Sequence, residues 1–521
     1  MPKGPIVFFV LCIVGILGLY FGIPMVREVR HRGASDAAML KGEIKGRCDE
    51  WVGYFPLMSQ RMKNAMAESG YRFKCEDDGA KYAERMEALK NGDIDFAVAT
   101  NDSYIVNAAK RGFPGVITTV IDESFGGDSM LAWGDVIPNL NAIKGRTDIK
   151  IGYTCDSPSH HLAKAAAHHF DIPELIDKKL VVCTDGSKEA LQKLQKKEIQ
   201  VAIMWEPDVS RGLAKTGVIK LLGTESTVRL IVDILLFKST FSEKNPETVK
   251  TFQENYFKVL KFYMDNPSIL EQEVMASINA KAAVEDRLTI DQVRSMLKGV
   301  RWVNLTENAE KWFGITTLAG TRGEHWLTDS IDSTAEILIN SKDFPSNPLP
   351  EQDASRITQK KFIADLYEKM TIGFTVAGAG KNVSSDSLTT KFSPLSEAGW
   401  QNLKEVGTMK VEHINFEMGT SELSSEDKEK FAAITERIKH YPTFWLLIKG
   451  HTSAIGDPKE LLELSQERAD SVQRFLSITY GIDENRMRAV GLGSSKPIPC
   501  ASSKCRFVLP RVEIVMMSEV Y

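Results

Sequence analysis

Short apolar segments alternate with amphipathic segments between residues 42 and 240, and this alternation constrains the fold more than any other feature of the chain. In the first run, strands are predicted at residues 43–48, 71–75, 95–100 and 115–121, and helices at 57–69 and 81–92. In the second run, strands are predicted at residues 149–155, 180–184 and 201–205, and helices from Pro158 and around 186–196. Such alternation is typical of parallel sheets with helices on both faces, and two runs predict two α/β lobes. The following residues, 244–371, are predicted to be mainly helical.

An uncharged apolar run, Ile6–Val26, precedes the lobes. At 1.5 Å per residue it spans roughly 30 Å, the thickness of the hydrocarbon layer of a bilayer. No small-residue cleavage site follows it, so residues 1–32 are predicted to be an uncleaved signal anchor with one transmembrane helix. Basic residues lie on both sides of the run, and the charges alone leave its orientation open.

The overall composition is that of a folded protein of several domains. The chain has 521 residues, 43% of them hydrophobic, and a formal net charge of −4. Since there is no basic excess, nucleic acid is not expected as a partner.

Four cysteines end corresponding strands of the two runs. Cys48 and Cys75 end the first two strands of the first run, and Cys155 and Cys183 end the equivalent strands of the second. Successive strands of a β-α-β unit are often neighbours, so each couple is predicted to form a disulfide, which suits an oxidising compartment. The alternative is that they are buried small hydrophobic residues. No C-x₂-C zinc spacing occurs, and neither a metal nor a cofactor is predicted.

Polar and aromatic side chains gather where the predicted strands end. They are Trp51, Tyr54, Asn101, Asp128, Ser157, Ser159, His160, Trp205 and Glu206. Ligands of open α/β sheets bind at the carboxyl ends of strands, so these residues predict a small-molecule cleft. The helix that begins at Pro158 offers free N–H groups to an anion, while Asp128 and Glu206 would take a cationic or donor group. Each residue taken singly has a plainer interpretation, as core, helix cap or turn.

Four histidines lie on the helix after Ser157, at positions 160, 161, 168 and 169. No carboxylate or cysteine is spaced to complete a metal site with them, and the favoured interpretation is a solvated helix face.

Several segments in this order resemble periplasmic solute-binding proteins of ABC importers. They are WVGYFPL from Trp51, ALKNGDIDFAVAT, FGGDSML, VAIMWEPDVS and NPETVKTF. The resemblance covers residues 42–372 and points to the group that includes nitrate-, taurine-, alkanesulfonate- and thiamine-precursor-binding proteins. It implies a hinged, two-lobed fold that closes over a small ligand, and it does not name that ligand. The helix start after Ser157, together with Asp128 and Glu206, favours an anionic or zwitterionic solute.

A Gly-, Ser- and Thr-rich stretch, residues 373–408, is predicted to be a linker with one helix around 395–406. Strands are then predicted at 409–419, 443–453, 486–493 and 511–517, and helices from Ser425 and Pro458.

Residues 409–521 resemble the C-terminal domain of the OmpA family, an α/β sandwich, in the segments INFEMGTSEL, IKGHTSAIG, LSQERADSV and PRVEI. In that family an aspartate after Gly-His-Thr and an arginine in the following helix grip the diaminopimelate of peptidoglycan. This chain keeps Thr452 and Arg468 but has Ser453 in place of the aspartate, so weak peptidoglycan binding is expected. Further departures are Leu462, Leu509 and Pro510, which would favour a protein partner of the envelope instead. The resemblance also implies a Cys500–Cys505 disulfide.

Together the resemblances imply a non-enzymatic protein anchored in the bacterial inner membrane, with most of the chain in the periplasm. It would bind or sense a small solute and associate with the cell wall. The alternatives are a substrate-binding subunit of an ABC importer and a degenerate scaffold in an envelope complex. A motor-stator subunit is disfavoured because Ile6–Val26 contains no aspartate.

Overall fold

A computed structural model describes residues 40–315, 324–374, 392–411, 414, 416, 420, 421, 423, 425–452, 456–495 and 511–519. Several predictions lie outside these residues, namely the span Ile6–Val26, Ser453, Leu509, Pro510 and the Cys500–Cys505 pair. Within the described ranges, no helix is both long enough and apolar enough to cross a membrane.

Lobe one is built on a six-stranded sheet whose order is β11-β4-β10-β3-β1-β2. Its strands are β1 (Gly42–Cys48), β2 (Tyr71–Asp77), β3 (Phe96–Thr100), β4 (Gly115–Ser124), β10 (Val232–Lys238) and β11 (Val300–Trp302). Between the first strands lie α2 (Phe55–Met58), α3 (Gln60–Glu68), α4 (Tyr82–Asn91) and α5 (Asn101–Ala108). Every residue of β3 is buried, and the Thr100 side chain caps the first turn of α5, so the chain turns directly from sheet to helix.

Lobe two is built on a five-stranded sheet whose order is β7-β6-β8-β5-β9. Its strands are β5 (Asp128–Trp133), β6 (Ile151–Tyr153), β7 (Val181–Cys183), β8 (Val201–Trp205) and β9 (Val218–Gly223). Its helices are α6 (Pro158–Phe170), α7 (Ser187–Gln195) and α8 (Asp208–Leu213). Pro158 is the first residue of α6, as predicted, because a helix start needs no N–H from that position.

Both sheets are mixed, which corrects the prediction of parallel sheets. β10 runs antiparallel to β3 and β4, and β5 runs antiparallel to β8 and β9. The reason is that the chain crosses between the lobes twice, from β4 into β5 and from β9 back into β10. Lobe two therefore begins at Asp128, earlier than the alternation of strands and helices indicates.

The predicted helical region returns to lobe one and completes its core. Its longer helices are α9 (Ser239–Lys244), α10 (Pro246–Asp265), α11 (Pro267–Lys281), α12 (Ile290–Leu297), α14 (Trp326–Asn340) and α15 (Lys361–Phe374). Phe252 on α10 packs with the rings of Phe73, Phe96 and Phe237 from the sheet.

The C-terminal domain has a four-stranded sheet of order β12-β15-β13-β14. Its strands are β12 (Lys404–Thr408), β13 (Trp445–His451), β14 (Met487–Gly491) and β15 (Arg511–Ser518), and its helices are α16 (Glu397–Asn402), α17 (Ser425–Lys439) and α18 (Pro458–Tyr480). β12 was predicted to belong to the linker. It pairs with β15 because Val406 buries its side chain in the domain core, so the ordered domain begins earlier in the chain.

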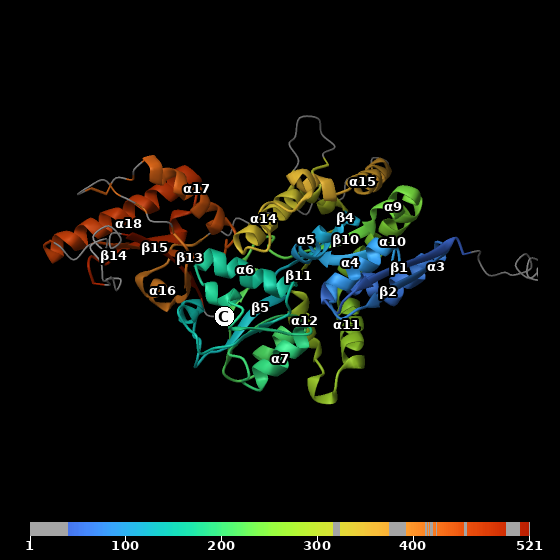
Figure 1. Ribbon diagram of the computed structural model, residues 1–521, viewed down its shortest axis with the longest axis horizontal. Coiled ribbons are helices and arrows are strands. Elements are labelled where there is room, and N and C mark those ends of the chain that lie inside the picture. The colour runs from blue at the N-terminus through green and yellow to red at the C-terminus, as the bar shows by residue number, and fades with distance from the viewer. Residues whose placement is uncertain are drawn as a thin grey trace, which may run out of the picture.

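The C-terminal domain and lobe two share one hydrophobic core, in which Phe170 of lobe two lies beside Tyr441 with ring centroids 5.3 Å apart. Backbone hydrogen bonds join the same two bodies, from Lys410 N to His169 O and from Val228 N to His440 O. In Figure 1 lobe two lies between the C-terminal domain and lobe one along the long axis. The C-terminal domain is therefore fixed to one lobe of the pair.

Candidate functional site

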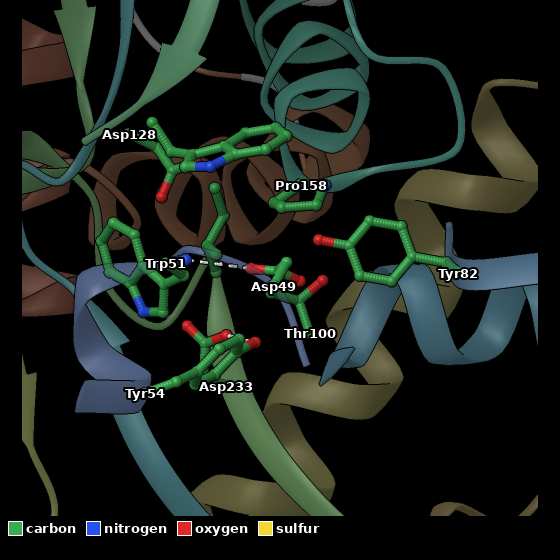
Figure 2. A pocket seen from close by; sticks show the side chains of 10 residues that line it. Asp49, Trp51, Tyr54, Tyr82, Thr100, Asp128, Pro158 and Asp233 are labelled. Carbon is green, nitrogen blue, oxygen red and sulfur yellow. Dashed lines mark hydrogen bonds between the residues drawn. The ribbon is translucent and has the colours of Figure 1, made fainter. Parts of the chain in front are cut away.

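A small chamber lies between the two lobes, at the carboxyl ends of β1, β3 and β8 (Figure 2). Its volume is about 10 Å³, which is room for about one water molecule. It is lined by Asp49, Trp51, Tyr54, Tyr82, Thr100, Asp128, Pro158, Trp205, Ile231 and Asp233. Side chains from both lobes close it, so the lobes stand close together in this structure.

A larger cleft of about 530 Å³ lies beside the chamber and shares Asp49, Trp51 and Trp205 with it. Lobe one contributes Phe55 and Ile278 among others, and lobe two contributes Ser187, Lys188 and Asp208. This outer cleft has the size of a small-molecule site, and the chamber is its inner end.

Trp51 is held in place by two buried carboxylates. Its backbone N–H donates to Asp49 Oδ1 at 3.1 Å, and its indole Nε1–H donates to Asp122 Oδ1 at 3.1 Å. The indole also lies against Gly127, where an added Cβ would come within 2.1 Å of Trp51 Cη2. The Gly-Gly pair before Asp128 thus lets the crossing between the lobes pass close to the ring.

Other carboxylates of the site are partnered within lobe one. Asp49 Oδ2 lies 3.1 Å from Arg85 Nη2, and Arg85 also pairs with Asp78. Tyr54 donates its hydroxyl to Asp233. Asp233 lies opposite Asp122 in the β10–β4 register, and burial followed by the Asp122 charge raises the pKa of Asp233 well above its usual range.

Asp128 differs from these carboxylates, because one of its oxygens has no hydrogen-bond partner among the described residues. Its side chain is buried, and its Oδ1 accepts no hydrogen bond from any described residue. Burial raises the pKa of Asp128 to about 8, against a lowering by the Ser124 hydroxyl, and the charges of Asp102 and Asp122 raise it further. Burial likewise raises the pKa of Asp122 to about 7. The chamber therefore concentrates carboxyl groups whose ionisation is costly without a partner.

Four of the nine predicted ligand residues line the chamber, namely Trp51, Tyr54, Asp128 and Trp205. The other five lie near it and have contacts of their own. Asn101 Nδ2 donates to Ser330 Oγ, Ser157 Oγ donates to Thr154 O, and Asp156 N donates to His160 Nδ1. Glu206 accepts from both Ser210 N and Ser210 Oγ, which turns its carboxylate toward α8. Ser159 is buried, and its hydroxyl has no partner within the described ranges.

Sequence reasoning missed several residues of the chamber. Asp49 and Thr100 stand at strand ends, so the rule that selected Trp51 also applies to them. Asp233 interrupts the apolar run 231–237, and an acidic residue inside such a run is a signal in itself. Tyr82 comes from the start of α4, and nothing in the sequence distinguishes it.

The predicted solvated histidine face is wrong. His161 and His169 are buried, because α6 packs between the sheet of lobe two and the C-terminal domain. His169 Nδ1 lies 2.8 Å from the Tyr441 hydroxyl, and its ring stacks on His440 at 5.4 Å. Among the described residues, no group of three or more His, Cys, Asp or Glu side chains is arranged to hold a metal ion.

The cysteine couples differ from each other. Cys155 and Cys183 form a disulfide with a Cα–Cα distance of 5.3 Å, which confirms that prediction. Cys48 and Cys75 are unbridged, with their sulfurs 2.7 Å apart across the β1–β2 pair. Their disulfide stays a prediction.

In the C-terminal domain, α18 packs along β14, with Ser465 and Gln466 at its carboxyl end and Gln473 at its amino end. Gly493 N donates to Ser465 Oγ at 2.9 Å, and Thr452 N donates to Gly493 O at 3.0 Å. Gly450 permits this approach, because a Cβ there would lie 2.1 Å from Ser465 O. Thr452 and the helix that carries Arg468 thereby come together at the carboxyl end of β13.

Arg468 is largely buried in this arrangement. Its Nε donates to Thr420 O at 3.1 Å, and its guanidinium lies 4.8 Å from the centre of the Phe416 ring. Asp457 caps α18 by accepting from Lys459 N and Glu460 N, so it is engaged with the helix. By contrast Leu462, six residues before Arg468 on the same helix, is 50% exposed.

Comparisons with known proteins agree with the resemblance predicted for the C-terminal domain. Residues 415–505 match the OmpA family. Outer membrane porin F of Pseudomonas aeruginosa is 28% identical over 107 residues, which cover 20% of this chain and 31% of that protein. The peptidoglycan-associated lipoprotein of Buchnera aphidicola is 27% identical over 117 residues, which cover 22% of this chain and 64% of that protein. The matched region thus spans about a third of porin F and less than two-thirds of the lipoprotein.

The solved structures that align with the earlier part of the chain include solute-binding proteins. The alkanesulfonate-binding protein SsuA of Xanthomonas axonopodis pv. citri, bound to MOPS, aligns over 63% of this chain and 100% of its own. The sequences are 11% identical and the TM-score is 0.45.

Proposed function

We propose that this chain is a solute-binding protein of the bacterial envelope, and not an enzyme, whose C-terminal domain associates it with the cell wall. The observation that carries the proposal is the inter-lobe site, in which aromatic walls and buried carboxylates from two separate sheets meet at one chamber. Such a site becomes complete when the lobes are together, which is how a two-lobed protein captures a ligand.

The wall association is supported by the OmpA match over residues 415–505 and by the name of the peptidoglycan-associated lipoprotein. Arg468 and Thr452 are present on the corresponding elements. Because Ser453 replaces the expected aspartate, we propose weak binding to peptidoglycan. The exposed Leu462 supports the alternative of an envelope protein as the partner at this edge.

We further propose that Ile6–Val26 anchors the chain in the inner membrane, with the lobes and the C-terminal domain in the periplasm. The uncharged length of that run and the Cys155–Cys183 disulfide support this arrangement.

Two alternatives have distinct signatures. A conventional importer subunit must diffuse to a permease. A chain that is anchored in the membrane, and whose wall-associating C-terminal domain is packed against lobe two, is poorly suited to such diffusion. A degenerate scaffold would keep the fold without a working cleft. The buried carboxyl groups on the chamber walls argue for a working cleft. Each of them lowers the stability of the fold, and a scaffold that binds no ligand would have no need of them.

A thermal-shift screen of the purified periplasmic part, residues 33–521, tests the proposal. The panel contains amines, amino acids, pyrimidines, oxyanions and sulfonates, with Trp51→Phe as the site variant and Trp400→Phe, in the C-terminal domain, as its matched control. We expect at least one class to stabilise the wild type and the control alike, and the site variant less. If no compound shifts the wild type, the scaffold alternative is correct.

A further inference from the structure

Three buried hydrogen-bond acceptors at the strand ends around the chamber lack donors. Asn101 Oδ1, Asp102 Oδ1 and Asp128 Oδ1 are buried, and none has a hydrogen-bond partner within the part of the chain that the structure describes. Buried acceptors without partners are rare in folded proteins. Of the three residues, Asp128 lines the chamber itself. The carboxyl group that lines the chamber therefore lacks a donor at one of its oxygens.

The cations nearest the chamber are already engaged. Arg85, which is fully buried, pairs with Asp49 and Asp78 and donates to Val98 O. On the lobe-two side, Lys164 lies 3.0 Å from Asp343. The largest charge effects on Asp128 come from other carboxylates, namely Asp102, Asp122 and Glu206, and each raises its pKa. An anionic ligand would add to this repulsion, whereas a cationic ligand would relieve it.

The remaining walls also suit a cation. Trp51, Tyr54, Tyr82 and Trp205 all line the chamber, and aromatic faces attract cations. Figure 2 shows Trp51, Tyr82, Asp49, Asp128 and Asp233 around one shared space.

The volume limits the kind of cation. The chamber of about 10 Å³ holds a group of about the size of a water molecule, which fits a primary ammonium and excludes a trimethylammonium. A primary ammonium also supplies three N–H donors, which a quaternary group lacks. The rest of the ligand would lie in the adjoining cleft of about 530 Å³.

We propose that the chamber binds the primary ammonium head of a small organic amine, with Asp128 as its main carboxylate and Trp51 and Trp205 as its walls. This inference rests on the proposed solute-binding function and names the class of solute. The sequence led us to expect an anionic group of the ligand at the start of α6. We now propose that the group that determines specificity is a cation, bound by Asp128 at the start of β5.

Isothermal titration calorimetry of the full-length protein in detergent micelles tests the inference with three probes, 1,4-diaminobutane, choline and ethanesulfonate. We expect 1,4-diaminobutane to bind at least tenfold more tightly than either of the others. Asp128→Asn should weaken its binding at least tenfold. The control Asp148→Asn removes an exposed aspartate that pairs with Arg146 at the opposite, amino-terminal end of β6, and its affinity should stay within twofold of the wild type.

The pH dependence supplies a readout that a folding defect would not mimic. Because the ammonium needs an ionised Asp128, affinity should rise between pH 6 and pH 8 in the wild type and stay flatter in Asp128→Asn. Equal or tighter binding of choline would overturn the inference. Binding of ethanesulfonate alone would overturn it while leaving the solute-binding function intact. If no probe binds, the inference is wrong, and the broader thermal-shift screen decides the function separately.

Discussion

Replacing Asp128 by asparagine should stabilise the protein, and the gain should grow with pH. The carboxyl group is 2% exposed and its Oδ1 has no hydrogen-bond partner among the described residues. Burial raises its pKa from 3.8 to about 8, so folding at neutral pH requires either a proton on the carboxyl group or an unpaired buried charge. Asparagine has nearly the same shape and needs neither.

The size of the effect follows from proton linkage. Between the unfolded pKa of 3.8 and the folded pKa of about 8, the folded state holds a proton that the unfolded state has lost. The free energy of unfolding of the wild type therefore falls as pH rises, by about 1.4 kcal/mol per pH unit, and levels off above pH 8. From pH 5 to pH 8 this amounts to about 3–4 kcal/mol. Since asparagine does not titrate, the advantage of the variant should grow by that amount.

Differential scanning calorimetry of the ligand-free protein at pH 5 and pH 8 measures this difference. We expect the transition of the two lobes to rise by several degrees more in Asp128→Asn at pH 8 than at pH 5. Asp148→Asn, which loses an exposed ion pair, should change little at either pH. A gain that is equal at both pH values would refute the reasoning, since it would mean that Asp128 does not change its ionisation in this range.

Three further predictions concern the C-terminal domain and the cysteines. In pull-downs with isolated sacculi, Ser453→Asp should bind about ten- to a hundredfold more tightly than the wild type, because a charged hydrogen bond contributes roughly 1.5–3 kcal/mol, and Arg468→Ala should not bind. Tight wild-type binding that Ser453→Asp does not improve would contradict this. Non-reducing peptide mapping of membrane-purified protein should find all three predicted disulfides, and free thiols in every couple would argue against the periplasmic location. Finally, burial holds the pKa of His169 well below its usual range, so docking of the C-terminal domain should weaken as pH falls from 6.5 toward 5. Limited proteolysis at pH 7.5 and pH 5 should show the change, and His169→Phe should reduce it.

The elements of the fold were largely predictable because their signals are local. Pro158 starts α6, and the apolar run of residues 201–205 coincides with β8, since both depend on neighbouring residues alone. The direction of the crossing strands was not predictable. Whether β10 runs parallel or antiparallel to its neighbours depends on where the chain returns from lobe two, and residues 231–237 do not encode that.

The site was half predictable for a related reason. Position at a strand end selected Trp51 and Trp205, which both line the chamber, but it does not determine where a side chain points. Glu206 has the same kind of position and turns to Ser210 instead. The excess of buried acid was not foreseen either, because Asp49, Asp128 and Asp233 are far apart in the sequence and meet through folding.

Because lobe two and the C-terminal domain share one hydrophobic core, the molecule consists of two rigid parts of unequal size. One part is lobe one, and the other is lobe two together with the C-terminal domain. Opening or closing of the cleft is then a rotation of lobe one relative to lobe two and the C-terminal domain, which would move together. β1 and the C-terminal domain lie toward opposite ends of the long axis (Figure 1), so such a swing changes the end-to-end extent of the chain. Binding of a ligand in a chamber about the size of a water molecule would thus change the distance between the C-terminal domain and the start of lobe one.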